Sequence, residues 1–271
     1  MSPGPSLGKP AAYNDFVLAR RVDLIDEMSR DARGFDEPVS GLRAAAGDRR
    51  SGRSGVPGFH GAKLLDVGCG NGAQTVRLLG RFRHVVGLDV VREHLGTFRR
   101  ALAGLDGANC SPVLYDGARM PFRDGEFDAV LSIETLEHAA NEQQLLREIR
   151  RVLQPGGTLV LSVPNKWWIF ETHGANLPLL PWNRVPFFSW LPGPIHGRYA
   201  RARIYTRRGL VQLLSAAGFR VLLTRYLAAP MDVVRNRALA GFLRATVFRG
   251  PRTRVPLLST SVFVMAQRPV R

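Results

Sequence analysis

The sequence predicts an α/β fold in which helices cover both faces of a mostly parallel sheet. Three observations lead to this prediction: short apolar runs recur from residue 63 onward, segments with helical spacing lie between them, and no internal repeat interrupts the alternation. At 271 residues the chain is long enough for one large domain with appendages. Right-handed crossovers would bring the carboxyl ends of the strands to one edge, where such sheets bind ligands.

Seven apolar runs are expected to form the strands of this Rossmann-like sheet. In chain order they are KLLDVG, HVVGLDV, SPVLYD, FDAVLSI, TLVLSVP, FRVLLTRY and TSVFVMAQ. The helices of the sheet are expected at AQTVRLLGRF, REHLGTFRRALAG, NEQQLLREIRRVL, TRRGLVQLLSAAG and MDVVRNRALAGFLRATVF. Gly218 suits the end of the fourth helix, because glycine adopts the left-handed conformation of a C-cap at little cost.

Residues 1–62 are expected to precede the domain proper. Apolar residues at near-helical spacing predict a helix over 13–32. A glycine- and arginine-rich stretch without periodicity follows at 41–61, which is typical of a flexible, solvated linker. The domain itself is then expected to span 63–271.

Composition excludes some classes and leaves two partners to weigh. No stretch approaches the roughly 18 apolar residues that cross a bilayer, and the N-terminus lacks the layout of a secretory signal, so we expect a cytoplasmic protein. Two cysteines are too few for a disulfide framework. The formal charge of +16 suggests nucleic acid or an anionic membrane as partner. However, 35 arginines against 3 lysines are typical of a GC-rich genome. Since no RNA- or DNA-binding module is recognisable, nucleic acid is not the expected partner, whereas peripheral contact with the inner face of the membrane stays open.

The stretch LLDVGCGNGAQ places a strand directly before a glycine-rich loop. Gly68, Gly70 and Gly72 permit a sharp turn and leave no Cβ between the backbone N–H groups and a ligand. The pattern G-x-G-x-x-G/A, met here with Ala73, also occurs in dinucleotide-binding proteins and is weak alone. Asp66 precedes the loop, and its carboxylate would repel a pyrophosphate but attract an ammonium group. The loop therefore predicts a zwitterionic ligand without phosphate.

Two further acids follow the next strands. Asp89 ends the second strand about 20 residues beyond the loop, where an acid accepts hydrogen bonds from ribose hydroxyls. Asp116 ends the third strand and can accept from the exocyclic amine of adenine. Acids at three successive strand ends form one row that faces a ligand, and they disfavour the 2′-phosphate of NADP.

These motifs resemble those of the class I S-adenosylmethionine (SAM)-dependent methyltransferases. LLDVGCGNG resembles the first motif of that family and GLDV the second, while YDGARMPFRDGEFDAVLSIETLEH and LQPGG resemble its later segments, so the similarity covers roughly 63–164. The resemblance implies SAM as the cofactor and an antiparallel last strand. The implied cofactor residues are Asp66, Gly68, Cys69, Gly70, Asn71, Gly72, Asp89, Val90, Asp116, Gly117, Ser132 and Ile133.

The same resemblance distributes these residues along the cofactor. Asp66, Gly68 and Gly70 would hold the methionine end, and Asp89 the ribose. Asp116 and Gly117 would flank the adenine, although the family more often has alanine in place of this glycine.

The segment IETLEH carries the candidate catalytic groups. If residues 134–138 form a helical turn, then Glu134, Glu137 and His138 share a face and are spaced to hold a divalent cation such as Mg²⁺. The E-x-x-E-H spelling is similar to that of quinone-pathway O-methyltransferases, in which it binds magnesium, and to that of a small-RNA terminal methyltransferase group. In other members of the family L-E-H occurs without a metal, and the histidine lines the pocket or acts as a base. In either case we expect His138 to contact the substrate, with Glu137 as a second catalytic residue.

Residues 164–206 are too long for an ordinary connection and predict a lid rich in aromatic side chains. In the family this segment commonly covers the acceptor, which implies an apolar acceptor, aromatic or prenylated. Packing of the aromatic rings on the main core is the alternative. His173 and His196 are secondary catalytic candidates, and nearby arginines suit lipid headgroups. The aromatic residues and arginines are Trp167, Trp168, Phe170, Trp182, Phe187, Phe188, Trp190, Arg198, Arg201 and Arg203.

The N-terminal helix carries Tyr13, Arg20 and Arg21, and in relatives such a helix folds over the cofactor. Either arginine is a candidate partner for the cofactor carboxylate, and a solvated helix face is the alternative. The sequence thus predicts transfer of a methyl group from SAM to a small, apolar or aromatic acceptor, with O-methylation favoured. The alternatives are an RNA methyltransferase, methylation of a lipid or natural product at carbon or nitrogen, a non-catalytic partner subunit of the same fold, and an NAD oxidoreductase. The oligomeric state is left open.

Overall fold

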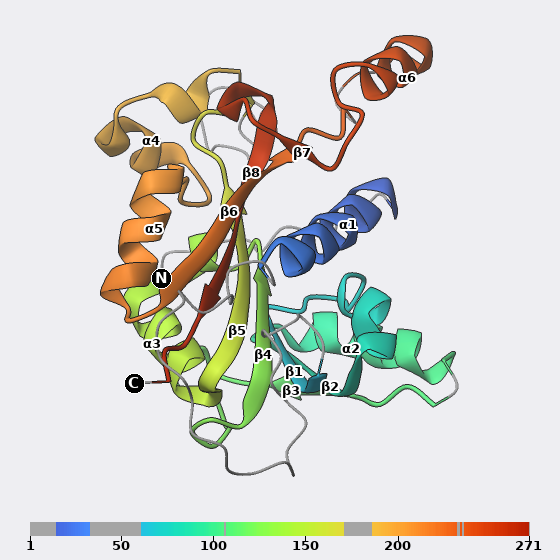
Figure 1. The fold of residues 1–271 in the computed structure, drawn as a ribbon, viewed down its shortest axis with the longest axis vertical. Helices are drawn as coiled ribbons and strands as arrows, with labels where there is room; N and C mark the ends of the chain where they lie inside the picture. The colour runs from blue at the N-terminus through green and yellow to red at the C-terminus, as the bar shows by residue number, and fades with distance from the viewer. Residues whose placement is uncertain are drawn as a thin grey trace, which may run out of the picture.

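A computed structural model describes residues 15–32, 61–105, 107–170, 186–231, 234 and 236–270. Its centre is one eight-stranded sheet in the order β3-β2-β1-β4-β5-β8-β6-β7, with helices on both faces (Figure 1). The strands are β1 (Gly61–Val67), β2 (Phe82–Asp89), β3 (Cys110–Leu114), β4 (Phe127–Ile133), β5 (Leu153–Pro164), β6 (Arg220–Ala228), β7 (Arg252–Thr253) and β8 (Ser259–Gln267). The predicted glycine- and arginine-rich linker lies almost wholly outside the described residues.

The pairing confirms the predicted α/β class. Strands β1 to β5 pair in parallel, and β8 is antiparallel to both β5 and β6. The seven predicted strands are all present, and β7 is an eighth that the sequence did not indicate. This strand has only two residues and pairs antiparallel with β6 at the edge of the sheet. Two residues are too short to show an alternating pattern, which explains the difference.

The helices match the predicted segments with three differences. The stretch AQTVRLLGRF forms a 3₁₀ helix rather than an α-helix, the last helix is shorter than the pattern suggested, and the aromatic insertion contains a short helix of its own. The α-helices are α1 (Asp15–Ala32), α2 (Arg92–Ala103), α3 (Glu142–Val152), α4 (Gly193–Tyr199), α5 (Arg207–Ala216) and α6 (Arg237–Ala245). The 3₁₀ helices are η2 (Thr75–Arg81), η3 (Leu136–His138), η4 (Phe188–Trp190) and η5 (Pro256–Leu258).

Local capping fixes the ends of the two helices that cover one face. The Asn141 side chain accepts a hydrogen bond from Gln144 N at 3.0 Å at the start of α3. Thr206 Oγ1 accepts one from Gly209 N at 3.1 Å at the start of α5. Beyond the end of α5, Gly218 has a φ of 83°, which confirms the expected glycine terminator.

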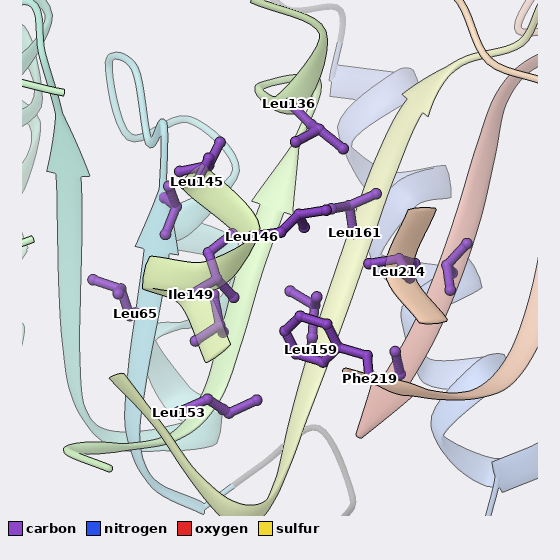
Figure 2. Packing of buried hydrophobic residues seen from close by; sticks show 14 of the residues in the cluster. Leu65, Leu136, Leu145, Leu146, Ile149, Leu153, Leu159, Leu161, Leu214 and Phe219 are labelled. Carbon is purple, nitrogen blue, oxygen red and sulfur yellow. The ribbon is translucent and has the colours of Figure 1, made fainter. Parts of the chain in front are cut away.

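Helices α3 and α5 bury one face of the sheet. Their apolar side chains, among them Leu146, Ile149 and Leu214, are fully buried against strand residues such as Leu65 and Leu159 (Figure 2). Burial of each large apolar side chain contributes about 1.5–3 kcal/mol, so this layer provides much of the stability of the fold.

Helix α1 and η2 cover the opposite face. Leu24, Ile25 and Met28 of α1 are fully buried with Phe263 and Met265 of β8. The N-terminal helix is therefore part of the core rather than an appendage. Taken over the described residues, no helix is long and apolar enough to cross a membrane.

Ion pairs and hydrogen bonds hold α1 to distant parts of the chain. Asp31 pairs with Arg225 of β6 at 2.6 Å, and Glu27 pairs with Arg252 of β7 at 2.6 Å. The buried Arg20 guanidinium donates to the carbonyl oxygens of Ala229, Phe248 and Gly250. Hydrogen bonds to a charged group contribute about 1.5–3 kcal/mol each. The three hydrogen bonds of Arg20 join residues more than 200 positions apart in the sequence.

Candidate active site

The glycine loop is fixed to the strand beside it. The backbone N–H groups of Gly68 and Cys69 donate to Leu88 O at 2.7 and 3.1 Å. Gly68 has a φ of 74°, and a Cβ at this position would lie 2.2 Å from Thr135 Oγ1. Because Thr135 Oγ1 in turn donates to Val67 O at 3.1 Å, the loop after β1 and the turn after β4 pack tightly together.

The other two glycines serve different purposes. At Gly72, φ is 79° and a Cβ would lie 2.0 Å from the ring of Phe98, so bulk is excluded there by the protein itself. At Gly70, φ is 55° and no atom lies within 4 Å of the position that a Cβ would take. The bare side of Gly70 therefore faces open space, as expected of a loop that receives a ligand.

Asp89 organises the loop from the end of β2. Its Oδ2 accepts a hydrogen bond from Gly70 N at 2.8 Å, and its Oδ1 accepts one from Val91 N at 2.8 Å. His94 Nδ1 lies 3.6 Å from the same Oδ1. Each carboxylate oxygen has a second lone pair, so Asp89 retains capacity to accept from ribose hydroxyls.

Asp66 lies beneath the loop with 3% of its surface exposed. Its Oδ2 accepts a hydrogen bond from Thr75 Oγ1 at 2.6 Å. Burial raises the pKa of this carboxyl to about 7, with a further increase from the charge of Asp89, and the Thr75 hydrogen bond only partly opposes the shift. A cationic group beside Asp66 would favour its charged form, so the site suits an ammonium group.

Three other predicted cofactor residues take supporting positions. The Cys69 side chain packs under the loop with Leu95 and Phe98, where burial raises the pKa of the thiol. Only its backbone is therefore placed to meet a ligand. The Asn71 side chain accepts from Ala73 N at 3.2 Å within the loop, and Ser132 is fully buried in β4.

Residues from the ends of β2 and β3 meet beside the row of acids. Val90 is 48% exposed although it is apolar, and a Cβ on Gly117 would lie 3.5 Å from its Cγ1. Asp116 is exposed, and its Oδ1 accepts from Ala118 N at 2.8 Å. An exposed apolar side chain, a bare backbone and a carboxylate are together suited to the face and amine of an adenine ring.

Residues 134–138 do not form the helical turn expected from the sequence. Glu134 has a φ of 52°, outside any helix, and only Leu136–His138 make a single 3₁₀ turn. Glu134 Oε1 accepts a hydrogen bond from Ser162 Oγ at 2.7 Å, whereas Glu137 is 2% exposed and His138 faces solvent.

The expected Mg²⁺ site at Glu134, Glu137 and His138 is corrected by this geometry, because Glu137 is buried whereas His138 faces solvent. In the part of the chain that the structure describes, no three His, Cys, Asp or Glu side chains are grouped to hold a metal ion. Burial and the nearby charge of Glu134 raise the pKa of Glu137 well above its usual range, which favours its protonated form. His138 is the exposed titratable side chain of the turn.

The end of the aromatic insertion lies on this turn. Arg203 N donates to Glu137 O at 3.2 Å, and the Arg203 guanidinium donates to Ala139 O at 2.5 Å. Tyr205 OH donates to Glu142 Oε2 at 2.8 Å. Residues 203–205 thus attach the insertion to the turn that carries His138, as the lid interpretation requires.

The aromatic side chains of the insertion divide into two groups. Trp168 and Phe188 are each 5% exposed and pack inward, while Trp167, Phe187 and Trp190 are 43%, 54% and 42% exposed. The packing interpretation therefore holds for Trp168 and Phe188, and a role of the exposed rings toward an acceptor stays a prediction. His196 is 4% exposed, with its ring 5.2 Å from that of Phe188, so its place is in the packing. His173 and Trp182 lie outside the described residues.

The two arginines of α1 have separate roles, and Tyr13 lies outside the described residues. Arg20 binds backbone carbonyls, as described above, and does not reach the glycine loop. Arg21 is 8% exposed, and its Nη2 lies 4.0 Å from Glu134 Oε1 at the end of β4. Sequence reasoning missed Ser162 and Thr135. Ser162 belongs to no recognisable motif, and Thr135 lies within IETLEH but is not one of its acid or histidine positions; the pairing of β4 with its neighbours brings both to the site.

The fold and this site define a class of protein: a Rossmann-like domain that binds an adenosine-containing, zwitterionic ligand at the carboxyl ends of its strands. Residues 65–161 match the family described as "Methyltransferase domain". Over these residues the match confirms the resemblance to class I SAM-dependent methyltransferases noted in the sequence.

Similarity to individual proteins supports this assignment. A ubiquinone biosynthesis O-methyltransferase of Dechloromonas aromatica is 31% identical over 137 residues, covering 45% of this chain and 54% of the relative. A human protein named "Probable tRNA methyltransferase 9B" is 31% identical over 132 residues, covering 46% of this chain and 26% of the relative. This chain thus spans about half or less of the length of these relatives.

Among solved structures, the [4+2]-cyclase SpnF has a similar fold, with a TM-score of 0.52 and 23% identity over 78% of this chain and 76% of the other. At this identity the similarity concerns the fold alone.

Proposed function

We propose that this protein transfers a methyl group from SAM to a small, apolar acceptor, aromatic or prenylated, and that the acceptor atom is oxygen. The observation that carries the proposal is the contact between Arg203 and the turn of Glu137 and His138, which brings the aromatic insertion beside the edge where the cofactor residues meet. SAM supplies an activated methyl group whose leaving group needs no proton. The task of the protein is therefore to hold the acceptor in line with that methyl group.

Each part of the site supports one step of this function. Asp66 binds the ammonium end of the cofactor, the bare face of Gly70 admits it, and Asp89 holds its ribose. His138, exposed on the turn, accepts the proton of a hydroxyl acceptor, a role that contributes typically 10²–10⁴-fold in rate. Glu137, buried and favouring its protonated form, positions the turn rather than removing a proton.

The apolar acceptor is argued from the exposed rings of the insertion. Trp167, Phe187 and Trp190 remain accessible although their neighbours Trp168 and Phe188 are buried. Accessible aromatic rings beside a catalytic turn suit an apolar ligand, which they stack on or enclose. The Dechloromonas relative is named for ubiquinone biosynthesis, and ubiquinone is an apolar quinone, which is consistent with this choice.

RNA is the second candidate, favoured by the net charge and by the name of the human relative. A direct experiment separates the two. Purified protein is incubated with methyl-labelled SAM and either a catechol, the same catechol with a prenyl tail, or transfer RNA. We expect label in the catechols, with the prenylated form turned over at a lower KM. Label in RNA alone would reject the small-molecule proposal, and a thermal shift by SAM but not by NAD would check the cofactor independently.

A further inference from the structure

The positive charge of the chain is concentrated at its C-terminal end. Residues 172–271 contain sixteen arginines and a single acidic residue, whereas residues 1–171 contain twenty-two basic and twenty-one acidic residues. Nearly all of the net charge of +16 therefore belongs to the last hundred residues. A genome-wide preference for arginine would not produce this asymmetry, because arginine is frequent in both parts.

Helix α6 lies in this basic region and projects from the body of the molecule (Figure 1). One side of the helix is anchored: Ala240 is buried, and Leu243 packs against a cluster that contains Trp168 and Phe248. The adjoining side is apolar as well, although it faces solvent. Leu239 and Phe242, one helical turn apart, are 49% and 63% exposed.

The exposed apolar surface continues past the helix. Val247, in the turn after α6, is 57% exposed. Leu239, Phe242 and Val247 are called the α6 patch below. An exposed cluster of this kind on a projecting element is a common mark of an interaction site.

Arginines border the patch in the sequence that follows it. Arg249 and Arg254 are exposed, and no ion pair is recorded for either within the described ranges. By contrast, Arg252 between them pairs with Glu27 of α1. Two exposed arginines thus remain available in the segment that follows the apolar side chains.

We propose that the α6 patch docks this protein on an anionic lipid surface, with Leu239, Phe242 and Val247 entering the boundary between headgroups and acyl chains. Arg249 and Arg254 contact the phosphates. A short helix with apolar side chains outward and flanking cations has the composition of an interfacial helix. Cations held near an anionic surface strengthen such binding by about fivefold each.

Charge complementarity alone would fit RNA as well as an anionic membrane. The apolar side chains of the α6 patch favour the membrane. A phosphate backbone offers no environment for exposed Leu, Phe and Val side chains, whereas a bilayer does. The anchored side of α6 packs on Trp168 of the aromatic insertion, so the docked surface and the insertion belong to one end of the molecule. This placement lets an acceptor dissolved in the bilayer approach the insertion without crossing water.

The experiment is sedimentation of the full chain with vesicles of phosphatidylcholine that contain about a quarter phosphatidylglycerol. We expect the wild type to sediment with these vesicles and not with phosphatidylcholine alone. Phe242→Asp is expected to lower the partition coefficient more than tenfold, because a carboxylate must leave water on docking. The double variant Arg249→Glu and Arg254→Glu is expected to lower the partition coefficient further than Phe242→Asp does. The difference between the double variant and the wild type should be smaller at high salt, because salt screens the charges.

Val270→Asp is the matched control. Val270 is 69% exposed, and the C-terminus next to it lies at the opposite end of the molecule from α6 (Figure 1). This variant should bind vesicles as the wild type does. Unchanged circular dichroism of each variant establishes that the fold is intact.

Four outcomes would overturn the proposal. Three concern vesicles: no binding by the wild type, binding by Phe242→Asp equal to that of the wild type, or wild-type binding to neutral vesicles equal to that to anionic ones. The fourth is a wild-type dimer that Phe242→Asp abolishes, which would make a second copy of the chain the partner at the α6 patch. Binding to transfer RNA that depends on the arginines while vesicle binding is absent would assign the surface to nucleic acid. Since the readout is sedimentation, the result does not depend on the proposed methylation.

Discussion

Gly70 and Gly72, which the sequence presents as equivalent, should respond differently to the same substitution. Gly70→Ala places a methyl group at a φ of 55° in open space, so its cost in folding is that of the left-handed conformation, about 1–2 kcal/mol. Gly72→Ala adds a Cβ 2.0 Å from the Phe98 ring, and overpacking adds about 1–3 kcal/mol to the same backbone cost. For a chain of this size, each kcal/mol lowers the Tm by roughly 2–4 °C.

Cofactor binding should follow a different order. The Cβ of Gly70→Ala occupies the space that we assign to SAM, so its Kd for SAM should rise at least about tenfold, equivalent to about 1.4 kcal/mol. Thermal unfolding and calorimetric titration of SAM on both variants measure the two quantities. Wild-type affinity in Gly70→Ala would refute the placement of the ligand, and equal losses of Tm in the two variants would refute the packing argument at Gly72.

Four further predictions follow from the site. SAM affinity should fall as the pH drops below about 7, because protonation of Asp66 removes the charge that attracts the ammonium group. The Asp66→Asn variant should bind SAM weakly at every pH. Titration of SAM across pH 5.5–8.5 measures both. Burial raises the pKa of Asp66 from 3.8 to about 7, so the folded protein favours the protonated carboxyl. The stability that this carboxyl contributes to the ligand-free protein is therefore present below about pH 4 and lost by about pH 7. Denaturant unfolding at several pH values measures this loss. His138→Ala should lower kcat for a hydroxyl acceptor by about 10²–10⁴-fold and leave the Kd for SAM unchanged, and an unaltered pH–rate profile would exclude it as the base. Arg203→Ala should raise the KM for the acceptor while cofactor affinity stays constant, because the side chain donates to the carbonyl oxygen of Ala139 and so holds the insertion to the turn. A selective loss of SAM binding would contradict this.

The arrangement of the predicted cofactor residues along one edge of the sheet could be predicted from the sequence because each lies at or just after the end of a strand. The loop of Gly68–Gly72 follows directly on a strand, Asp89 ends β2 and Asp116 lies two residues beyond β3, so parallel pairing brings them to one edge. The conformation of residues 134–138 could not be predicted in this way. Glu134, Glu137 and His138 would share a face only if the backbone were α-helical, and Glu134 has a φ of 52°.

Long-range contacts explain the remaining differences. Nothing near Arg20 in the sequence indicates that its guanidinium binds carbonyls of residues 229, 248 and 250. Likewise, the pattern of α6 predicts a helix but not which apolar side chains stay exposed, because that depends on what packs against Leu243.

The burial of α1 has a consequence for anyone who wishes to shorten this protein. The recognisable methyltransferase region ends at residue 161, yet its central strands pack on Leu24 and Met28 from one terminus and on Phe263 and Met265 from the other. A fragment trimmed to the recognisable region would leave one side of the sheet bare and prone to aggregate. A shortened protein must accordingly keep, besides the recognisable methyltransferase region, the helix before the glycine loop and the two long strands after the insertion.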